Sequence, residues 1–416
     1  MKKQPFFYSM LGVTLVIVLA QFASAAAPRT IVVTSVNQSF DRQNIQNAID
    51  SANEGDTIEL VGAFQLDGIS VHIRKSVNII GRAIDNDNDE KTNEDWADGI
   101  NNDGDNSIDE DDWDAALIGI ADIDGRPAPE VGPAIFNRGL AIDAVTGSID
   151  VSVRNLKFST LTRGMGVYPG AEESLLCTRF STDGMVTGLT FADNFITNCN
   201  RGFEIFGGAE HFNVENNVFM DMQRADILLV AEFSGCFNAD GTPGPGVAIG
   251  EVRKGQVFSN RLTRGGGVVT VEADVISVFN NELNIRGGIQ IIAGSDNSVQ
   301  RNSISNTFFA VYADGFSPHS TISNNVLRDN SYGVFLDANA NDFTVINNEC
   351  YAEEFDYAVF GVQNKIISTD FSCTLETDSA SNKLIGTLSM TNNPSFPNDV
   401  QTQLEELAAE LANRQP

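Results

Sequence analysis

Apolar and polar positions recur in short blocks along the C-terminal half of the chain. Seven asparagines mark the recurrence, spaced 21 to 23 residues apart except for one step of 43. They are Asn194, Asn217, Asn260, Asn281, Asn302, Asn325 and Asn348. An apolar residue or cysteine stands two positions after each, and a small residue opens a second apolar run, as in Gly288-Ile289 and Gly333-Val334. The pattern predicts two or three short strands per repeat, separated by polar corners.

One repeat is too short to bury its own apolar face, so we expect identical units to stack as coils. Their strands would then hydrogen-bond about 4.8 Å apart in parallel sheets. Asparagine suits the corners because its short amide tolerates left-handed dihedrals and bonds nearby backbone. Amides stacked in register can also bond one another. The alternative, that these asparagines are ordinary loop residues, does not account for the apolar residue at a fixed offset.

The N-terminal part begins with a different pattern. Apolar residues between Asn44 and Ala52 have helical spacing, which predicts a helix that covers the open end of the first coil. The segments IQNAIDSANEGDTIEL and VNIIGR, followed by the Asn-x-aliphatic repeats, resemble the pectin-lyase-like superfamily over roughly Thr30 to Thr387. The resemblance implies an all-β fold, a right-handed parallel β-helix or solenoid. That superfamily includes polysaccharide lyases, glycoside hydrolases, uronate epimerases, phage tailspikes and adhesins, so fold alone does not select an activity.

The expected organisation is a single domain with appended segments. Residues 1–25 form a signal peptide, residues 26–399 the β-helix domain and residues 400–416 an amphipathic C-terminal helix. The domain carries an acidic insertion, 85–114, and two loop insertions, 169–183 and 234–246, which could wall a cleft. The C-terminal helix either caps the far end, lies along the coil or mediates oligomerisation.

Charge and the N-terminal segment define the expected location. A basic start, a short apolar run and Ala23-Ser24-Ala25 have the form of a cleaved secretory signal, so we expect a bacterial protein that is secreted or periplasmic. No later stretch is long and apolar enough to span a membrane. The formal net charge of −30 argues against nucleic acid as a partner. The oligomeric state stays open.

The acidic insertion has the composition of a calcium site. It holds fourteen acids and one lysine. Within DGINNDGDNSIDEDD the expected metal ligands follow an EF-hand-like spacing, and a second, poorer set precedes them; the two sets are Asn101, Asp103, Asp105, Asp109 and Asp112, and Asp85, Asp87 and Asp89. Oxygen ligands at every second residue suit Ca²⁺. Asn106 stands where an EF-hand has glycine, so a looser loop is expected, and a disordered acidic segment is the alternative. Trp96 and Trp113 could anchor the insertion on the coil.

Five cysteines give two candidate pairings in an exported protein. Cys350 and Cys373 lie 23 residues apart, one coil, and Cys177 and Cys236 lie in the two loop insertions. The odd count leaves at least one thiol without a partner within the chain, and Cys350 could instead be a small apolar residue of the core.

Aligning the repeats places basic residues in one column. Arg163, Arg201, Arg224, Arg264 and Arg286 stand just before the second strand of successive repeats, and Phe309, Tyr332 and Tyr357 take this place afterwards. Stacked guanidinium groups repel one another unless anions lie among them. The anions are either acids of the chain, such as Glu204, Asp226 and Glu272, or the carboxylates of a bound polysaccharide.

Alternation along the second strand predicts a second, acidic site. The expected outward positions are Glu204, Gln290, Tyr312, Asp314 and Asp337. Asp314 and Asp337 would lie on adjacent coils, where a carboxylate pair could catalyse glycoside hydrolysis with a retaining geometry. Ordinary surface carboxylates are the alternative.

Two functions therefore remain open. One is binding of an anionic extracellular polysaccharide, with cleavage or epimerisation as a possible reaction and Ca²⁺ in a structural role. In that case the enzyme would be a polysaccharide lyase, a glycoside hydrolase or a uronate epimerase. The other is a non-catalytic, cell-surface or adhesive protein that uses the β-helix as a rigid rod.

Overall fold

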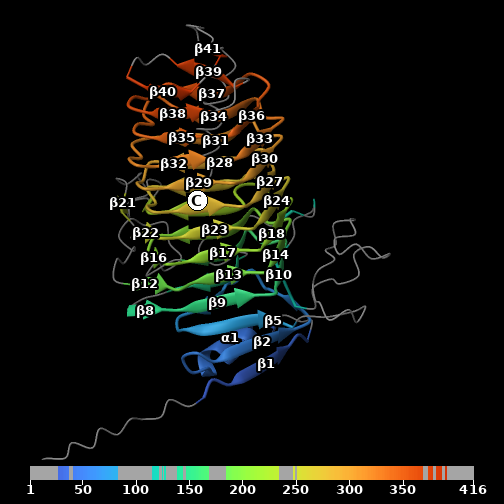
Figure 1. Cartoon of the computed structure of the whole chain (residues 1–416). Coiled ribbons are helices and arrows are strands. Elements are labelled where there is room, and N and C mark those ends of the chain that lie inside the picture. The colour runs from blue at the N-terminus through green and yellow to red at the C-terminus, as the bar shows by residue number, and fades with distance from the viewer. Residues whose placement is uncertain are drawn as a thin grey trace, which may run out of the picture.

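The computed structural model describes residues 27–36, 41–82, 115–120, 124, 126–127, 138–143, 147–167, 184–233, 247–248, 251–368, 373–377, 381–386 and 389–390. Three long parallel sheets wind around one axis (Figure 1). Sheet A consists of β1 (Thr30–Thr34), β2 (Thr57–Val61), β5 (Val77–Gly81), β9 (Val151–Arg154), β13 (Thr190–Ala192), β17 (Asn213–Glu215), β23 (Gln256–Phe258), β26 (Ser277–Phe279), β29 (Ser298–Gln300), β32 (Thr321–Ser323), β35 (Thr344–Ile346), β38 (Lys365–Ser368) and β40 (Lys383–Gly386).

The other two long sheets follow the same order of coils. Sheet B consists of β3 (Ala63–Gln65), β6 (Ala116–Ile118), β10 (Lys157–Ser159), β14 (Phe195–Thr197), β18 (Val218–Met220), β24 (Arg261–Thr263), β27 (Glu282–Asn284), β30 (Ser303–Ser305), β33 (Val326–Arg328) and β36 (Glu349–Tyr351). Sheet C consists of β4 (Val71–Ile73), β7 (Arg138–Ile142), β11 (Arg163–Val167), β15 (Arg201–Phe206), β19 (Ile227–Val230), β25 (Val268–Val271), β28 (Ile289–Ile292), β31 (Phe309–Asp314), β34 (Tyr332–Leu336), β37 (Phe355–Val359), β39 (Thr374–Thr377) and β41 (Ser389–Met390).

Two small sheets lie between the strands of sheets C and A in the chain. One is parallel, with β8 (Gly147–Ile149), β12 (Gly184–Thr187), β16 (Ala209–Glu210) and β22 (Val252–Arg253). The other is an antiparallel pair of β20 (Glu232–Phe233) and β21 (Val247–Ala248). With most strands in long parallel sheets, the predicted all-β, right-handed parallel β-helix is confirmed.

The core lies inside the cylinder because alternate residues of each strand point inward. In sheet A one inward column runs through six consecutive coils, and its members are at most 2% exposed; they are Val257, Val278, Val299, Ile322, Val345 and Ile366. Burying one aliphatic side chain of this size contributes roughly 1.5–3 kcal/mol. Each coil therefore depends on its neighbours for the burial that its own few residues cannot supply.

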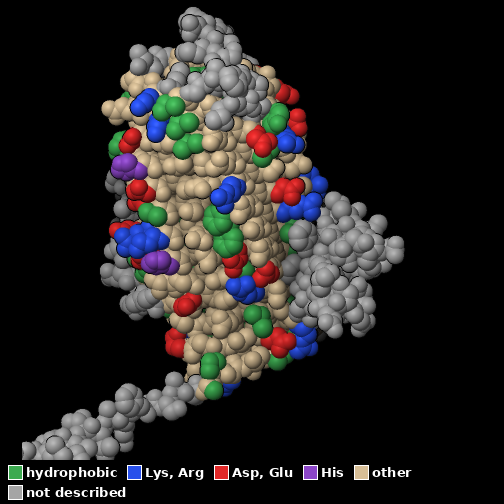
Figure 2. Space-filling view, in the orientation of Figure 1, with side chains coloured by type: hydrophobic (Ala, Val, Ile, Leu, Met, Phe, Trp, Pro, Cys, Tyr) green, Lys and Arg blue, Asp and Glu red, His purple; other side chains and the backbone are tan. Residues whose placement is uncertain are grey.

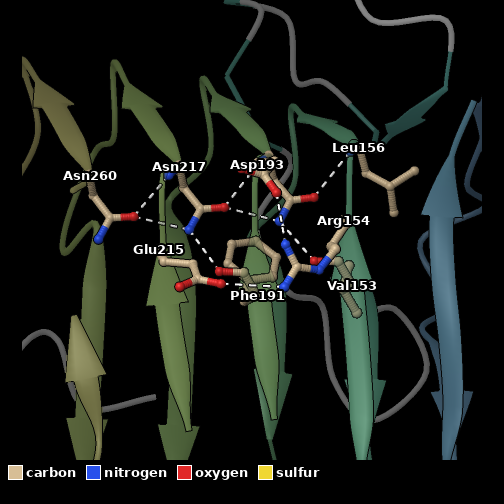
Figure 3. A network of polar contacts seen from close by, with 9 residues as sticks. Val153, Arg154, Leu156, Phe191, Asp193, Glu215, Asn217 and Asn260 are labelled. Carbon is tan, nitrogen blue, oxygen red and sulfur yellow. Dashed lines mark hydrogen bonds and ion pairs between the residues drawn. The ribbon is translucent and has the colours of Figure 1, made fainter. Parts of the chain in front are cut away.

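The predicted asparagine ladder occupies the corner between sheets A and B (Figure 3). The side-chain amide Nδ2 of Asn217 donates to Oδ1 of Asn260 at 3.0 Å and to the carbonyl oxygen of Phe191 at 2.9 Å. The backbone N–H of Asn217 donates to the same Oδ1 at 2.9 Å. Equivalent bonds link all seven ladder asparagines, which are at most 2% exposed. The bonds satisfy buried amides that would otherwise cost free energy.

The left-handed residue of this corner is the one before the ladder asparagine. Asn216, Asn280, Asn324 and Asn347 have φ between 48° and 56°, whereas the ladder residues do not have positive φ. Asparagine tolerates this conformation better than most residues. In each Asn-Asn pair the first asparagine adopts the left-handed conformation and the second forms the amide ladder, whereas the sequence had suggested both roles for one residue.

Helix α1 (Asp41–Ser51) begins three residues before the predicted start. The carboxylate of Asp41, the first residue of α1, accepts from the backbone N–H of Val36 and the hydroxyl of Ser35. Ile45 and Ile49 are buried in the core cluster, and α1 lies beside β1 and β2 at the N-terminal end of the cylinder (Figure 1). Within the described segments no helix is long and apolar enough to cross a membrane.

The appended segments follow or precede described strands at defined positions in the sequence. In the sequence the acidic insertion lies between β5 of sheet A and β6 of sheet B, and the two loop insertions follow β11 of sheet C and β20 of the antiparallel pair. The signal peptide, all eight predicted metal ligands, both loop insertions and the C-terminal helix lie outside the described residues. Of the cysteines, Cys199 is a free, buried thiol whose pKa is raised to about 12 by burial, and Cys373 forms a disulfide.

Candidate functional site

Strand register defines the outward columns of sheet C. Glu204 is followed on successive coils by Leu228, Val269, Gln290, Tyr312 and Phe335 in one column. The predicted outward positions Glu204, Gln290 and Tyr312 therefore do lie in line. All six side chains are at most 6% exposed, so this column is covered for most of its length.

The predicted column of five arginines is wrong. In sheet C, Arg163 pairs with Arg201 above it and with Arg138 below it, a residue that the repeat alignment missed. Counting back from the paired residues Ile227, Val268 and Ile289, the next positions of the column are Ala225, Gly266 and Gly287. Arg224, Arg264 and Arg286 stand one or two residues earlier in the chain.

Glycine runs at these corners explain the shift. A Cβ on Gly287 would lie 2.0 Å from the carbonyl oxygen of Gly266, so the chains approach too closely there for any side chain. Of the three aromatic residues predicted for this column, Phe309 and Tyr332 do lie in it. Phe309 pairs with Tyr332, and Tyr332 pairs with Phe355; the predicted Tyr357 is instead an inward residue aligned with Val334.

Arg163 and Arg201 are held by one buried acid. Glu204, with no exposed surface, lies between them: its Oε1 is 2.7 Å from Arg163 Nη1, and its Oε2 is 3.0 Å from Arg201 Nη1. The guanidinium of Arg163 also lies 5.9 Å from the ring centre of Phe206. Of the two alternatives for the anions, the chain's own acid is observed for this pair.

The remaining arginines and the other two candidate counter-ions, Asp226 and Glu272, lie elsewhere. Arg264 follows β24 of sheet B and pairs with both carboxylate oxygens of Asp221, at 2.6 and 2.8 Å. Asp226 accepts from the backbone N–H of Gly267 at 2.6 Å, and Glu272 is an exposed turn residue with φ of 53°. Arg286 is exposed.

Asp314 and Asp337 lie at aligned positions on adjacent coils, at the edge of sheet C where β31 and β34 end. Ala313 pairs with Leu336, and the backbone N–H of Asp337 donates to the carbonyl of Ala313 at 3.0 Å. The two aspartates therefore follow equivalent positions on adjacent coils, which are about 4.8 Å apart. Both side chains are half-buried.

Each carboxylate of the pair has its own donors. Asp337 Oδ2 accepts from the hydroxyl of Tyr312 at 3.1 Å, and its Oδ1 accepts from the N–H of Ala338 at 2.6 Å. Asp314 Oδ1 accepts from the N–H of Gly315 at 2.6 Å and from Nδ2 of Asn339 at 3.2 Å. Fixed donors of this kind orient the carboxylate oxygens.

Tyr312 links the acidic pair to an aromatic cluster. Burial raises the pKa of its hydroxyl above the ordinary value of 10.0, and the charges of Asp337 and Asp314 add to that effect. Its ring lies 5.4 Å from that of Phe309 and 5.9 Å from that of Phe335. The cluster continues through Tyr332 and holds Tyr312 against the sheet.

Two residues of this edge were not predicted. Phe316 is 64% exposed, and it forms an isolated bridge with Asn341 on the next coil. Asn339 is also exposed and contacts Asp314. An apolar residue directly after Asp314-Gly315, in a turn where the repeat has polar residues, was the signal that could have located Phe316. We call Tyr312, Asp314, Phe316, Asp337 and Asn339 the acidic edge.

Histidines line the turns between sheets C and A. His211 and His319 both have positive φ, at 56° and 60°, and Figure 2 shows histidine side chains along one margin of the sheet A face. His319 is 3.6 Å from Asp296 and 3.9 Å from Asp342, which flank it on neighbouring coils. His72, at the N-terminal end of sheet C, contacts Asp143 at 2.5 Å. Across the described segments no group of three acidic, histidine or cysteine side chains has the arrangement of a metal site.

Comparison with known proteins identifies the fold. The family model described as a right handed beta helix region matches residues 231–370. Together with the parallel sheets, this match shows that the chain folds as a right-handed parallel β-helix. No curated protein matches the sequence.

Several solved structures resemble the chain. DFA-IIIase from Arthrobacter chlorophenolicus A6, in complex with GF2, is 15% identical with a TM-score of 0.45, covering 86% of this chain and 93% of that one. The GH87 alpha-1,3-glucanase catalytic unit from Streptomyces thermodiastaticus strain HF3-3 is 12% identical with a TM-score of 0.46, covering 89% and 68%. Polygalacturonase from Erwinia carotovora ssp. carotovora is 11% identical with a TM-score of 0.44, covering 87% and 96%. At these identities and scores, none of them identifies a reaction for this chain.

Proposed function

We propose that the protein binds an extracellular polysaccharide at the acidic edge of sheet C. The observation that carries this proposal is the carboxylate pair on adjacent coils beside an exposed aromatic ring. Phe316, 64% exposed, offers a flat apolar surface for a sugar ring, while Asp314, Asp337 and Asn339 offer hydrogen-bond partners for its hydroxyls. The expected signal peptide supports an extracellular or periplasmic location.

We propose hydrolysis as the reaction to test at this edge. The strands of adjacent coils are about 4.8 Å apart. Carboxyl groups about 5 Å apart suit the retaining mechanism, in which one acts as nucleophile and the other as acid and then base. Asp337 is the better nucleophile candidate because the hydroxyl of Tyr312 orients it and stabilises its charge. Asp314 would protonate the leaving oxygen. The predicted lyase and epimerase reactions lack an equally specific set of residues here.

The anionic character of the polymer remains part of the proposal. The predicted arginine column would have favoured an anionic polymer. The pairing of Arg163 and Arg201 with Glu204 weakens that argument. The side chain of Arg74 is 64% exposed, but it lies 3.6 Å from Asp143 at the N-terminal end of sheet C, seven coils from Asp314. The proposed structural Ca²⁺ in residues 85–114 is the group that would favour a polyanion. Neutral polymers therefore belong in the same test.

The experiment compares alginate, pectate and neutral glucans, with Ca²⁺ and with a chelator. New reducing ends would indicate hydrolysis and unsaturated ends a lyase. Asp337→Asn should abolish product formation, and Phe316→Ala should weaken polymer binding, whereas the exposed Asp329→Asn and Tyr351→Ala should change neither. If wild-type protein neither binds nor cleaves any polymer, the proposal is wrong.

The non-catalytic rod is the second candidate, and one observation favours it. Arg163 and Arg201 both pair with the chain's own Glu204, as in a structural ion cluster. Binding that survives in Asp314→Asn and Asp337→Asn without any product from the wild type would favour this adhesive role.

A further inference from the structure

The outer face of sheet B carries a small apolar patch. Phe195, Val218 and Met220 form a hydrophobic cluster of their own, separate from the main core. They point outward, because Ile196 and Phe219 between them point inward and belong to the core. Such a patch is unusual on a sheet whose other outward residues are mainly polar.

This patch is covered, whereas later coils of the same face are open. Phe195 and Val218 are each 2% exposed and Met220 is 9% exposed. On the same sheet Glu282, Ser303 and Arg328 are exposed, and Tyr351 is 54% exposed. Lys157 lies over the Phe195 ring from the adjacent coil, so neighbouring side chains account for some of this burial. The low exposure of the whole cluster favours an additional covering segment.

Two cations bracket the patch. One outward column of sheet B reads Ala116, Lys157, Phe195, Val218 and Arg261 on successive coils. The ammonium nitrogen of Lys157 lies 5.5 Å from the ring centre of Phe195. The surface therefore suits a partner that combines apolar side chains with negative charge.

The acidic insertion joins the cylinder beside this surface. Sheet A strand β5 ends at Gly81 and sheet B strand β6 begins at Ala116, the first residue of that column. At about 4.8 Å per coil, Phe195 and Val218 lie roughly 10 and 14 Å further along. The residues between the two strands are ample for that distance.

We propose that residues 85–114 dock on the patch formed by Phe195, Val218 and Met220, with Trp96 and Trp113 as the apolar contacts. The insertion has fourteen acids against one lysine, which matches the cations of the column, and it contains both tryptophans of the chain. Docking would fix the predicted calcium loop against the side of the cylinder.

Because the chain has two tryptophans, intrinsic fluorescence reports on the insertion alone. In calcium-containing buffer, Val218→Asp should shift the emission to longer wavelength and increase acrylamide quenching several-fold. Val326→Asp is the matched control: the same change, in the same outward column three coils beyond Arg261, at a half-buried position. It should leave the emission unchanged. Equal effects of the two variants, or wild-type tryptophans quenched as fully as a free indole, would overturn the proposal.

A second measurement does not depend on a change within the sheet. In Trp96→Ala/Trp113→Ala, hydrogen peroxide should oxidise Met220 several-fold faster than in the wild type, while Met165 in the core should stay protected. An unchanged Met220 rate would mean that something else covers the patch. Protection that rises with protein concentration would point to a second copy and would likewise contradict intramolecular docking.

Discussion

The two acidic groups of sheet C differ in how their charge is balanced. Glu204 lies between two guanidinium groups and has no exposed surface. Asp314 and Asp337 are half-buried, and among the described residues neither contacts a lysine or arginine. All three were predicted as outward positions by the same alternation. Whether such a residue stabilises the fold or is available to a ligand therefore depends on its neighbours on adjacent coils, which strand alternation does not reveal.

The largest expected difference between the two groups is in stability. Glu204→Gln should lower the free energy of unfolding by about 3–5 kcal/mol, because it removes a carboxylate that pairs with two buried guanidinium groups. The measurement is chemical denaturation monitored by circular dichroism. The exposed Glu282→Gln is the control and should change stability by less than about 0.5 kcal/mol. A small effect at Glu204 would mean that the cluster is more hydrated than its burial indicates.

The second difference appears at alkaline pH. The pKa of Tyr312 is raised in the folded state, so its stabilising contribution is present below pH 10 and is lost as pH rises towards the folded pKa. Between pH 10 and the folded pKa, each pH unit should lower the free energy of unfolding of the wild type by about 1.4 kcal/mol. Tyr312→Phe should not show this loss. Denaturation at pH 9, 10 and 11 in both proteins provides the comparison. Tyr357, whose pKa is raised to about 12, is present in both proteins, so its contribution does not affect the difference between them. Parallel pH profiles would contradict the burial of the Tyr312 hydroxyl.

The smallest expected effect is at the acidic pair. Asp314→Asn keeps the size of the side chain and can still accept from the N–H of Gly315, so the free energy of unfolding should change by less than about 1 kcal/mol. Its effect should instead appear in polysaccharide binding or cleavage. Thermal unfolding and the polymer assay, carried out on the same preparation, separate the two. A loss as large as that of Glu204→Gln would show that the pair is structural.

The fold could be predicted because its determinants are local and repeated. Each ladder asparagine comes with an apolar residue at a fixed offset. The strand assignment therefore rests on several repeats, and a mistake in one of them does not change the others. The corner between sheets B and C has no such marker. Gly265 to Gly267 change its length, and residue counting then placed Arg264 in a column that it does not join. Glu204 was identified as a candidate counter-ion, but its burial depends on packing that no short pattern specifies.

Part of the candidate site could be predicted for the same reason. Asp314 and Asp337 follow strands of matched register, so their adjacency follows from the repeat. Phe316 and Asn339 lie in turns, where the conformation depends on the neighbouring coil more than on the local sequence. The hydrogen bond from Tyr312 to Asp337 spans 25 positions and could be inferred only once the register was known.

The bond between Asn217 and Asn260 is as short as the others of its series, although 43 residues separate the two. A single turn of this cylinder can thus take up a long excursion and close again with the same rise. The length of a connection between two strands can therefore change without a change in the pitch of the scaffold. Such connections are the places where a chain of this architecture can lengthen at little cost to its core.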